Sequence, residues 1–375
     1  MGNEKKFILG QYFTKPQIVN RLVELLLSYK DYKHGIKILE PSFGTGNFIE
    51  ALKTKGFTSI SGCEIDPQLT ANSSDFFDLS LGEKFDLVIG NPPFTKYNVK
   101  ESYYHAEKYV GRKVSPQEYL TTTLIKRGRT QVENAFVLKS IKHVKDQESS
   151  IGFVLPISFF IKGKNTEIKE EIVRNFSTVI VYQNDKKWFD EQIPCCFTIF
   201  TNIKQFEGKA ILLYENEENV EEILDIQSLL NEELIPRSFL FKKQTVREGT
   251  PLSNYLVETP IRFKKSFTEN NVSGSNILER NSIPAGKNVP DYCLAVVRVG
   301  NGSVGKAGLI NIKEDVLNDM LYVFAFKEEY QNNKQVKEKI CSLVNQNIEY
   351  IRNITFRVGS KSIKKRDILD LMVKF

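Results

Sequence analysis

Four consecutive residues, Asn91-Pro92-Pro93-Phe94, combine the groups needed to act on an aromatic amine. Each proline fixes its own φ and lacks an N–H, so the backbone offers carbonyl acceptors, and the asparagine adds an amide oxygen. The amino group of a nucleobase delocalises its lone pair into the ring, and it becomes nucleophilic only when acceptors hold its hydrogens out of plane. Asn91 and the Pro92 carbonyl could do this, while Phe94 offers a ring on which a base can stack. A rigid proline turn is the competing interpretation.

A glycine turn lies upstream. A short apolar strand at 36–40 leads into Pro41-Ser42-Phe43-Gly44-Thr45-Gly46 and then into a helix. Glycines at alternate positions let a ligand approach the backbone closely. Ile49 replaces the third glycine of the dinucleotide fingerprint, and no G-K-[ST] follows, so a dinucleotide site and a P-loop are both excluded. A nucleoside cofactor without a pyrophosphate is the remaining ligand, and a plain structural turn is the alternative.

Acidic residues follow at places where such a cofactor could be held. Glu64 ends a predicted strand at 59–63, where a carboxylate can accept from both hydroxyls of a ribose. Asp75 and Phe76 combine an acid and a ring, which suit an adenine amino group and its face. An exposed strand end is the alternative for Glu64, and a core position is the alternative for Phe76.

Strand and helix patterns alternate around these motifs, which is typical of an α/β fold with a parallel sheet. A helix is expected from Pro16, with Thr14 as its candidate N-cap. Further strands are expected at 85–90, 151–156, 179–182, 193–200 and 210–214, and further helices at 47–52, 133–143, 167–176 and, in an acidic stretch, 215–230. The elements expected beyond Pro236 are a hairpin turn at 299–305, a helix at 335–350 and a last short helix.

The length of 375 residues and the 41% hydrophobic content fit a globular protein of two domains. The longest apolar run, 151–161, is too short and too interrupted to span a bilayer, and the chain starts without the apolar region of a signal peptide. We therefore expect no membrane contact and a cytoplasmic location. The five cysteines and three histidines lack ligand spacing, so neither a metal site nor a disulfide framework is expected.

Charge divides the chain near Pro236. Residues 1–235 hold 29 Lys and Arg against 32 Asp and Glu, whereas residues 236–375 hold 23 against 14, a net charge of +9. The basic excess in the second domain favours a polyanion such as nucleic acid. A segment at 95–133, rich in Tyr, Lys and Arg, could contact a phosphate backbone. Candidates for phosphate contact in the second domain are Lys264, Lys265, Arg298, Lys306, Lys361, Lys364, Lys365 and Arg366.

The motifs resemble, in their order and spacing, those of the amino-methyltransferases. These are the segments Gly10 to Thr14, Glu40 to Phe48, Glu64-Ile65-Asp66, Asp75-Phe76 and Asn91 to Phe94. The similarity is strongest to the gamma-class adenine-N6 DNA methyltransferases of restriction-modification systems, the TaqI-like group, and covers roughly the first 200 residues. It implies a Rossmann-like, doubly wound catalytic domain at 1–235 that binds S-adenosylmethionine. It also implies a smaller, mixed α+β target-recognition domain at 236–375 that binds double-stranded DNA.

The resemblance also implies roles for single residues. Thr14, Glu40, Gly44 and Gly46 would surround the methionine part of the cofactor, Glu64 its ribose, and Asp75 and Phe76 its adenine. Pro41 and Asn91 would also bind the cofactor. Asn91, Pro92, Pro93 and Phe94 would hold the target base. Phe189 would stack on the other face of that base, with Trp188 as its rival, and a core role is the alternative for either ring.

The reaction expected from this resemblance is methylation of an adenine flipped out of duplex DNA. Cytosine-N4 stays open as the target, and a cognate restriction endonuclease is a candidate partner. The alternative enzymes are an rRNA guanine-N2 methyltransferase and a protein glutamine-N5 methyltransferase, which use the same acceptor chemistry. A DNA-binding subunit with a decayed methylase fold is the non-enzymatic alternative, and the intact Asn91, Glu64 and Asp75 argue against it.

Overall fold

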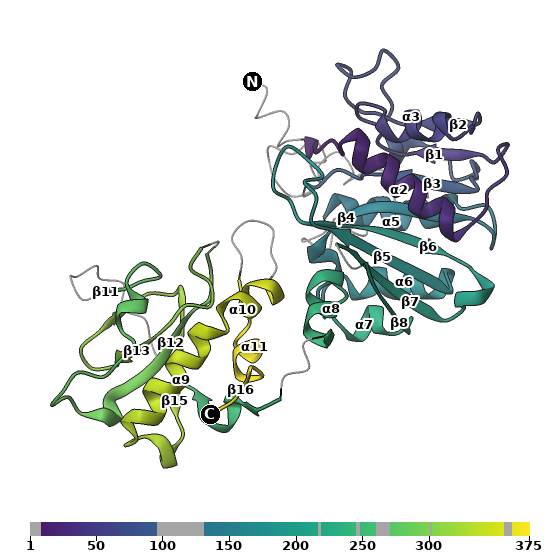
Figure 1. Cartoon of the computed structure of the whole chain (residues 1–375). Coiled ribbons are helices and arrows are strands. Elements are labelled where there is room, and N and C mark those ends of the chain that lie inside the picture. Colours follow the sequence, from purple (N-terminus) through teal and green to yellow (C-terminus); the bar gives the residue numbers. More distant parts are fainter. Residues whose placement is uncertain are drawn as a thin grey trace. The chain divides into compact units, whose positions relative to one another are not determined.

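The computed structural model describes residues 9–95, 131–216, 219–244, 248–259, 271–300, 302–355 and 362–375. The segment at 96–130, which includes most of the basic and aromatic stretch, and Lys264, Lys265 and Lys361 lie outside the described residues. The chain divides into a first unit, Met1–Pro236, and a second unit, Arg237–Phe375. We expected a domain boundary between residues 235 and 236. Each unit is described by itself below (Figure 1).

The first unit is built on an eight-stranded sheet with the strand order β2-β1-β3-β4-β6-β5-β7-β8. Its strands are β1 (Ile38–Glu40), β2 (Ile60–Gly62), β3 (Leu87–Gly90), β4 (Ser150–Pro156), β5 (Thr178–Asn184), β6 (Cys195–Thr201), β7 (Lys209–Glu215) and β8 (Val220–Asp225). Neighbouring strands from β2 to β4 are parallel, and β6 runs antiparallel to both β4 and β5. The expected α/β fold with a largely parallel sheet is confirmed.

Helices cover both faces of this sheet, as a doubly wound fold requires (Figure 1). The helices of the first unit are α2 (Pro16–Tyr29), α3 (Asn47–Thr54), α5 (Val132–His143), α6 (Thr166–Asn175) and the short α7 (Ser228–Asn231). The expected helix at Pro16 is present, but the expected cap is wrong. Lys15 is the N-cap, with an extended backbone and no capping side chain. The Thr14 hydroxyl is buried and has no hydrogen-bond partner among the residues that the structure describes.

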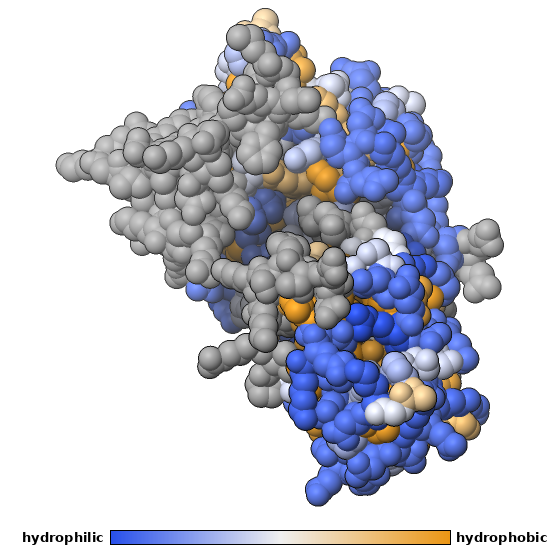
Figure 2. Space-filling model, turned by 90° about the vertical axis from the view of Figure 1, so that its left-hand side faces the viewer, coloured by the Kyte–Doolittle hydropathy of each residue, from blue (hydrophilic) through white to orange (hydrophobic). Residues whose placement is uncertain are grey.

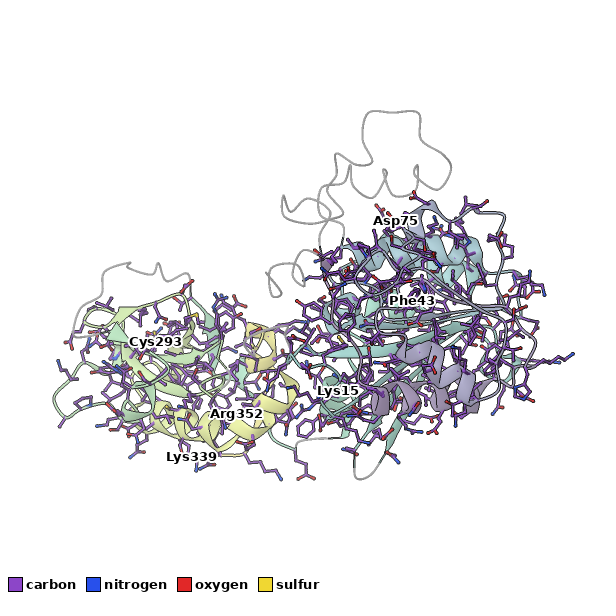
Figure 3. All side chains as sticks on the ribbon, turned by 90° about the horizontal axis from the view of Figure 1, so that it is seen from above. Lys15, Phe43, Asp75, Cys293, Lys339 and Arg352 are labelled. Carbon is purple, nitrogen blue, oxygen red and sulfur yellow. The ribbon has the colours of Figure 1, made fainter. Side chains whose placement is uncertain are left out.

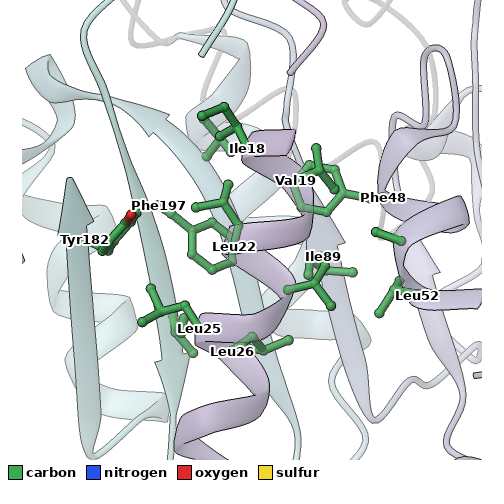
Figure 4. Close-up of a cluster of buried hydrophobic side chains, with 14 of the residues drawn as sticks. Ile18, Val19, Leu22, Leu25, Leu26, Phe48, Leu52, Ile89, Tyr182 and Phe197 are labelled. Atoms are coloured by element: carbon green, nitrogen blue, oxygen red, sulfur yellow. The ribbon is translucent and has the colours of Figure 1, made fainter. Parts of the chain in front are cut away.

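The apolar face of α2 forms the centre of the core on one side of the sheet. Ile18, Leu22 and Leu26 follow helical spacing, are buried, and pack against the strands (Figure 4). Ile89 of β3 and Phe197 of β6 belong to the same buried cluster. Because burial of each such side chain contributes roughly 1.5–3 kcal/mol, this packing anchors the segment that precedes α2 close to the end of β3.

The order of the strands reverses between β1 and β3. The chain passes from β1 outward to its neighbour β2 and then returns to β3 on the other side of β1. In open α/β sheets a crevice forms at such a reversal, beyond the carboxyl ends of the strands. The turn that begins at Pro41 and the turn that begins at Asn91 leave these two strand ends. The fold therefore brings the two predicted motifs to one crevice.

The acidic stretch at 215–230 differs from the expected helix. Its central part is the edge strand β8, which pairs antiparallel with β7 from Tyr214 opposite Val220 to Lys209 opposite Asp225. Residues along β8 alternate between half-buried and exposed, which is the period of a strand. Pairing with the open edge of β7 satisfies backbone groups in both segments, and this tertiary contact overrides the local helical propensity of glutamate.

The second unit contains an antiparallel sheet with the order β10-β15-β12-β13. Its main elements are α8 (Pro236–Gln244, shared with the unit boundary), β10 (Leu256–Glu258), β12 (Tyr292–Val297), β13 (Ala307–Asn311), β15 (Leu321–Phe326), α9 (Lys334–Gln346), α10 (Ile348–Ile354) and α11 (Lys365–Leu369). Four short strands form two further pairs: β11 (Asn271–Val272) with β14 (Val316–Leu317), and β9 (Thr250–Pro251) with β16 (Met372–Val373). The expected hairpin joins β12 to β13, and the expected helix at 335–350 is split at Asn347 into α9 and α10.

Successive residues of β12 pack into different clusters on the two faces of this sheet. Leu294 and Val296 belong to a core that includes residues of α9, whereas Cys293 and Ala295 belong to a smaller cluster. This alternation is the period-2 pattern of a strand covered on both sides. The second unit is therefore a mixed α+β structure with its own core.

The surface turned to the viewer in Figure 2 is mostly hydrophilic, with apolar side chains in small groups. Within the described part of the chain, no helix combines the length and the apolar character that crossing a membrane requires. The same residues contain no group of three His, Cys, Asp or Glu side chains arranged to hold a metal ion. All five cysteines are buried thiols.

Candidate active site

A cavity opens at the carboxyl ends of β1 and β3, where the strand order reverses. Four segments far apart in the sequence form most of its wall: 9–14 before α2, 40–48 after β1, 64–65 after β2, and Asn91 with Pro93 after β3. Asn91 therefore faces the same cavity as the turn that contains Gly44. This juxtaposition is the condition that the chemistry predicted for Asn91 requires.

The Asn91 side chain is oriented by the backbone of the N-terminal segment. Its Nδ2 donates to the main-chain carbonyl of Tyr12 at 2.5 Å. A carbonyl can only accept, so the amide oxygen must lie on the opposite side. This Oδ1 is buried and has no hydrogen-bond partner among the described residues. The Asn91 main-chain carbonyl, in contrast, already accepts a hydrogen bond from the Ser42 hydroxyl at 3.0 Å.

The glycine turn and Glu64 are joined by a direct hydrogen bond. The N–H of Gly44 donates to Glu64 Oε2 at 2.7 Å, and the N–H of Asp66 donates to Glu64 Oε1 at 2.8 Å. Gly44 has a positive φ of 52°, and a Cβ there would lie 2.8 Å from the ring of Phe13. Burial raises the pKa of Glu64, although the two backbone donors act in the opposite direction. The Glu64 carboxyl group is thus held in place just beyond the end of β2, where the sequence analysis expected it to bind a ribose.

Glu40 is a second buried carboxylate in this cavity. It is 2% exposed, and its Oε2 has no hydrogen-bond partner among the described residues. Burial raises its pKa well above the ordinary value, the N–H of Ile49 opposes this, and the nearby charge of Glu64 raises it further. Gly90 leaves the space that Glu40 occupies, because a Cβ at Gly90 would lie 3.2 Å from Glu40 Cγ. Two carboxylates in one cavity fit a ligand that carries positive charge and hydroxyl groups.

The N-terminal segment at 9–14 lies along the cavity, and its main-chain carbonyls accept hydrogen bonds from two other segments. The N–H of Phe94 donates to the Gly10 carbonyl at 3.1 Å, and Asn47 Nδ2 donates to the Thr14 carbonyl at 2.8 Å. Gly10 has a positive φ of 64°, and a Cβ there would lie 3.0 Å from the backbone of Phe94. Gln11 adds a side-chain bond to Asp66 Oδ2 at 3.0 Å. This segment therefore links the glycine turn, the strand tip and the Asn-Pro-Pro-Phe turn.

Asp75 and Phe76 are placed differently from each other. Phe76 lines the cavity but is 2% exposed, and its ring packs on Phe136 with centroids 4.9 Å apart. The Asp75 carboxylate accepts from the N–H of Phe77 at 2.9 Å and thereby caps a 3₁₀ turn. Figure 3 shows Asp75 near the margin of the first unit and Phe43 further inside. Asp75 does not line the cavity as formed by the described residues, so its contact with a cofactor adenine stays a prediction.

The two rings predicted to hold a target base touch each other. Phe94 and Phe189 pack edge to face, with centroids 6.2 Å apart and planes at 88°. Tyr12 stacks on Phe94 and meets the edge of Phe189. A base between Phe94 and Phe189 would require these rings to separate, so the stacking role of Phe189 stays a prediction. Trp188 is a core residue, because its ring stacks on Tyr182 and its N–H is bonded to Asn184.

The structure brings most of the predicted site residues to the cavity wall, but not all. Those that line it are Thr14, Glu40, Pro41, Gly44, Glu64, Phe76, Asn91 and Pro93. Those outside the lining are Gly46, Asp75, Pro92, Phe94 and Phe189. Gly46 instead begins α3 in a left-handed conformation, with φ at 80°. The motif analysis assigned no role to Gln11, Ser42 or Asn47. Their position inside the predicted motifs was the feature that could have indicated a role in the site.

Comparison with known proteins shows which family this chain is similar to. Residues 24–189 match the model of the Eco57I restriction-modification methylase family. The Type II methyltransferase M.HincII of Haemophilus influenzae is 25% identical over 245 residues, which is 63% of this chain and 46% of that relative. Modification methylase CviBIII of Paramecium bursaria Chlorella virus NC1A is 27% identical over 169 residues, 42% of this chain and 40% of that relative. The matched region thus spans less than half of the length of either relative.

Two solved structures are similar to this chain. The Type IIL restriction-modification enzyme MmeI in complex with DNA aligns with 98% of this chain and 69% of its own, with a TM-score of 0.51 and 10% identity. A putative class I S-adenosylmethionine-dependent methyltransferase of Listeria monocytogenes aligns with 51% of this chain and 61% of its own, with a TM-score of 0.38 and 15% identity.

The family match and the side chains of the cavity indicate the same cofactor. The family match supports S-adenosylmethionine, whose sulfonium, ammonium and ribose hydroxyls suit the buried acids Glu40 and Glu64. The chain shares its fold with MmeI. The predicted resemblance to the amino-methyltransferases of restriction-modification systems is confirmed by the family match over residues 24–189.

Proposed function

We propose that the protein is a site-specific DNA methyltransferase of a restriction-modification system, of the gamma class, which methylates N6 of an adenine flipped out of duplex DNA. One observation carries the proposal. Asn91 Oδ1 is a buried acceptor that has no partner in the described part of the chain, in the wall of a cavity that also contains the glycine turn and Glu64. A buried acceptor left unpaired costs roughly 1–3 kcal/mol. Such an atom is best explained by a donor that arrives with the substrate.

The cavity offers separate groups for the separate parts of the cofactor. When bound, S-adenosylmethionine supplies an electrophilic methyl group. Glu64 would accept from its ribose hydroxyls, and Glu40 would face its positive charge. The Thr14 hydroxyl, which is also buried and has no partner within the described ranges, would bind its methionine part. Asp75 and Phe76 would contact its adenine, Asp75 after a shift of the loop that it caps.

The Asn-Pro-Pro-Phe turn would prepare the target amine. The Asn91 amide oxygen and the Pro92 carbonyl accept hydrogen bonds from the two N6 hydrogens, which localises the nitrogen lone pair. S-adenosylmethionine would supply the methyl group, and Asn91 and the Pro92 carbonyl would hold the amine nitrogen in position to receive it. No side chain forms a covalent bond to the base, so positioning supplies most of the rate. Phe94 holds the base by stacking, and Phe189 covers its other side once the rings separate.

The second unit would recognise the DNA sequence. Among the candidates for phosphate contact, Lys365 pairs with Glu258 and Arg366 with Asp370. The Arg298 guanidinium lies 5.9 Å from the ring centroid of Tyr322, where it is held close to the protein surface. Exposed ion pairs contribute little stability and exchange readily for phosphate. We therefore propose that the basic excess of this unit contacts DNA. We also propose that the protein acts in the cytoplasm, and that a cognate restriction endonuclease acts on the same DNA sequence.

The relatives favour DNA as the substrate. Type II methyltransferases and a modification methylase are among the similar proteins, which favours DNA over rRNA or a release factor as substrate. Cytosine-N4 offers the same kind of exocyclic amine and is the alternative within DNA. Sequencing plasmid from cells that express the protein for modified bases distinguishes the two and gives the recognition sequence.

A transfer assay tests the proposal directly. Purified protein is incubated with labelled S-adenosylmethionine and, separately, duplex DNA, ribosomal RNA or release factor. Label on duplex DNA is the expected result, and the Asn91→Ala variant should leave that DNA unlabelled. Asn231→Ala serves as the matched control, because Asn231 is exposed at the end of α7, remote from the cavity lining. Label on RNA or on protein, with none on DNA, would replace the proposed substrate.

A further inference from the structure

A chain of hydrogen bonds, partly exposed at Arg21 and buried at Trp188, connects α2 to the loop that carries Phe189. It consists of Arg21, Glu215, Tyr182, Asn184 and Trp188, and we refer to it as the Trp188 relay. Arg21 Nε and the Tyr182 hydroxyl donate to Glu215 Oε2 at 2.7 and 2.5 Å. Asn184 Nδ2 donates to the Tyr182 oxygen at 2.8 Å, and Trp188 Nε1 donates to Asn184 Oδ1 at 2.7 Å.

Both ends of the Trp188 relay fix its direction. A carboxylate can only accept, so the Tyr182 hydroxyl must donate to Glu215. An indole N–H can only donate, so Asn184 must turn its oxygen toward Trp188 and its amide nitrogen toward Tyr182. The relay therefore has one arrangement of donors and acceptors. Burial raises the pKa of Glu215, but the bonds from Tyr182 and Arg21 outweigh burial and keep that pKa below its ordinary value, which favours the accepting carboxylate.

The relay is buried where it meets the loop. Tyr182, Asn184 and Trp188 are 2%, 8% and 5% exposed. Water therefore replaces a lost partner poorly, and each broken bond leaves an unsatisfied polar group in the core. The ring of Trp188 also stacks on Tyr182, and its carbonyl accepts from the N–H of Lys15 at 2.9 Å. The backbone around Trp188 is thus fixed from three directions.

The next residue along the chain, Phe189, contacts the active site. It is 1% exposed, and its ring meets Phe94 at 6.2 Å and Tyr12 at 6.4 Å between centroids. Tyr12 in turn provides the carbonyl that orients Asn91. A displacement of Trp188 would therefore be transmitted, through Phe189, to both the stacking ring and the residue that orients the amide.

We propose that the Trp188 relay holds the loop at 185–194 in place, so that Phe189 supports Phe94 and Tyr12 during capture of the target base. This inference rests on the proposed function and deepens it. It makes Asn184 and Tyr182 positioning residues, which touch neither cofactor nor base. The relay should govern base capture and leave cofactor binding alone, because its members lie outside the lining of the cofactor cavity.

The first experiment needs no DNA. Trp188 is the only tryptophan of the chain, so intrinsic fluorescence excited at the indole reports on the relay alone. Tyr182→Phe removes one hydroxyl from the relay, and Asn184→Ala removes its central amide. Tyr29→Phe is the matched control, because Tyr29 lines the same surface pocket as Arg21 and Tyr182 but is not a member of the relay. Quenching of Trp188 by acrylamide should increase severalfold in the relay variants and stay unchanged in Tyr29→Phe. Unchanged quenching in both relay variants would overturn the proposal.

The second experiment measures base capture. A duplex carries 2-aminopurine at the position that plasmid sequencing identifies as methylated, and its fluorescence rises when the base leaves the stack. In Tyr182→Phe, KM for DNA should increase by about tenfold or more and the fluorescence rise should shrink, while the Kd for S-adenosylmethionine stays within about twofold of wild type. Tyr182→Phe keeps the proposal testable if Asn184→Ala does not fold.

Failure of this inference and failure of the proposed function are distinguishable. If the wild type methylates DNA but the relay variants capture the base normally, the relay has no role in capture and the inference is wrong. If cofactor affinity falls in parallel with base capture, the relay only stabilises the fold, and the inference is again wrong. If Trp188 becomes accessible in the variants but the wild type labels no DNA, the proposed function fails and the relay's role in base capture fails with it.

Discussion

Asn91 and Tyr12 are 79 residues apart in the sequence, yet the Asn91 amide donates to the Tyr12 main-chain carbonyl. This contact decides which side of the amide faces the cavity, because the carbonyl can bind only the NH₂ group. The orientation of the amide oxygen is thus set by the backbone of another segment before the substrate arrives. Preorganisation of this kind reduces the reorganisation that the reaction would otherwise require.

Asn91→Ala removes that oxygen and should abolish methyl transfer, or lower kcat by at least about 10²–10³-fold, the typical effect of deleting one preorganised polar group. The Kd for S-adenosylmethionine, measured by calorimetry, should change little, because Glu40, Glu64 and the glycine turn stay in place. Single-turnover transfer of labelled methyl to DNA measures the loss. Near wild-type turnover in this variant would refute the role of Asn91.

Phe94→Ala should weaken capture of the target base by about 1–3 kcal/mol, the usual contribution of one aromatic ring stacked on a base. The effect should appear as an increased KM for DNA and a smaller 2-aminopurine signal. Phe94→Trp, which retains a ring, should recover most of it. Phe206→Ala is the matched control, since Phe206 packs on Tyr29 and has no place in the cavity. Equal losses in Phe94→Ala and Phe206→Ala would indicate general destabilisation.

Glu40→Gln should affect stability and cofactor binding in opposite directions. Burial raises the pKa of Glu40, so above pH about 4.5 the folded state holds this proton more tightly than the unfolded state does. Its contribution to the free energy of unfolding therefore decreases as pH rises, and glutamine removes that loss. Without cofactor, the variant should melt at a higher temperature than wild type at pH 7 and approach it near pH 4.

The same substitution should reduce cofactor affinity roughly 10- to 100-fold, because it removes a buried charge that faces the positive part of the ligand. Glu50→Gln is the matched control: Glu50 is an exposed acid of α3 that pairs with Lys53. Calorimetric titration with S-adenosylmethionine compares the two variants. Wild-type affinity in Glu40→Gln would exclude Glu40 from the cofactor site.

The sequence predicted the elements whose burial follows a simple period. The apolar spacing from Pro16 gave α2, and the apolar run before Asn91 gave β3. The acidic residues of β8 gave the wrong element, because their strand depends on pairing with β7, a partner that local propensity does not contain. Thr14 failed as an N-cap because its hydroxyl lies in the cavity wall and not over the end of α2.

The motifs predicted the site in outline, and the contacts across the chain completed it. Spacing placed Glu64 and Asn91 on strand ends, and the reversal of strand order then brought them together. No spacing rule indicated that Gln11 would bond to Asp66, or that Tyr182 would bond to Glu215. Such bonds join segments whose proximity is a result of the fold, so they cannot be derived from either segment alone.

Lys139 of α5 provides a test of the buried wall behind Phe76. Its Nζ is fully buried, has no hydrogen-bond partner among the described residues, and lies 5.1 Å from the ring centroid of Phe76. Burial lowers the pKa of Lys139 to about 8, although Asp75 and Asp78 act in the opposite direction. Between pH 8 and 10.5 the unfolded state thus binds more protons than the folded state at this site, so the contribution of Lys139 to stability increases with pH.

Lys139→Met replaces the ammonium with an apolar chain of similar length and should stabilise the protein at pH 7. The difference in free energy of unfolding between variant and wild type should shrink by up to about 3 kcal/mol as pH increases from 8 to 10.5. Denaturant unfolding at several pH values measures this difference, which cancels the other groups that titrate in the same range. Lys142→Met, an exposed position on the same helix, should show no such trend. A pH-independent difference for Lys139→Met would mean that Lys139 is already neutral, or is hydrated, in the folded state.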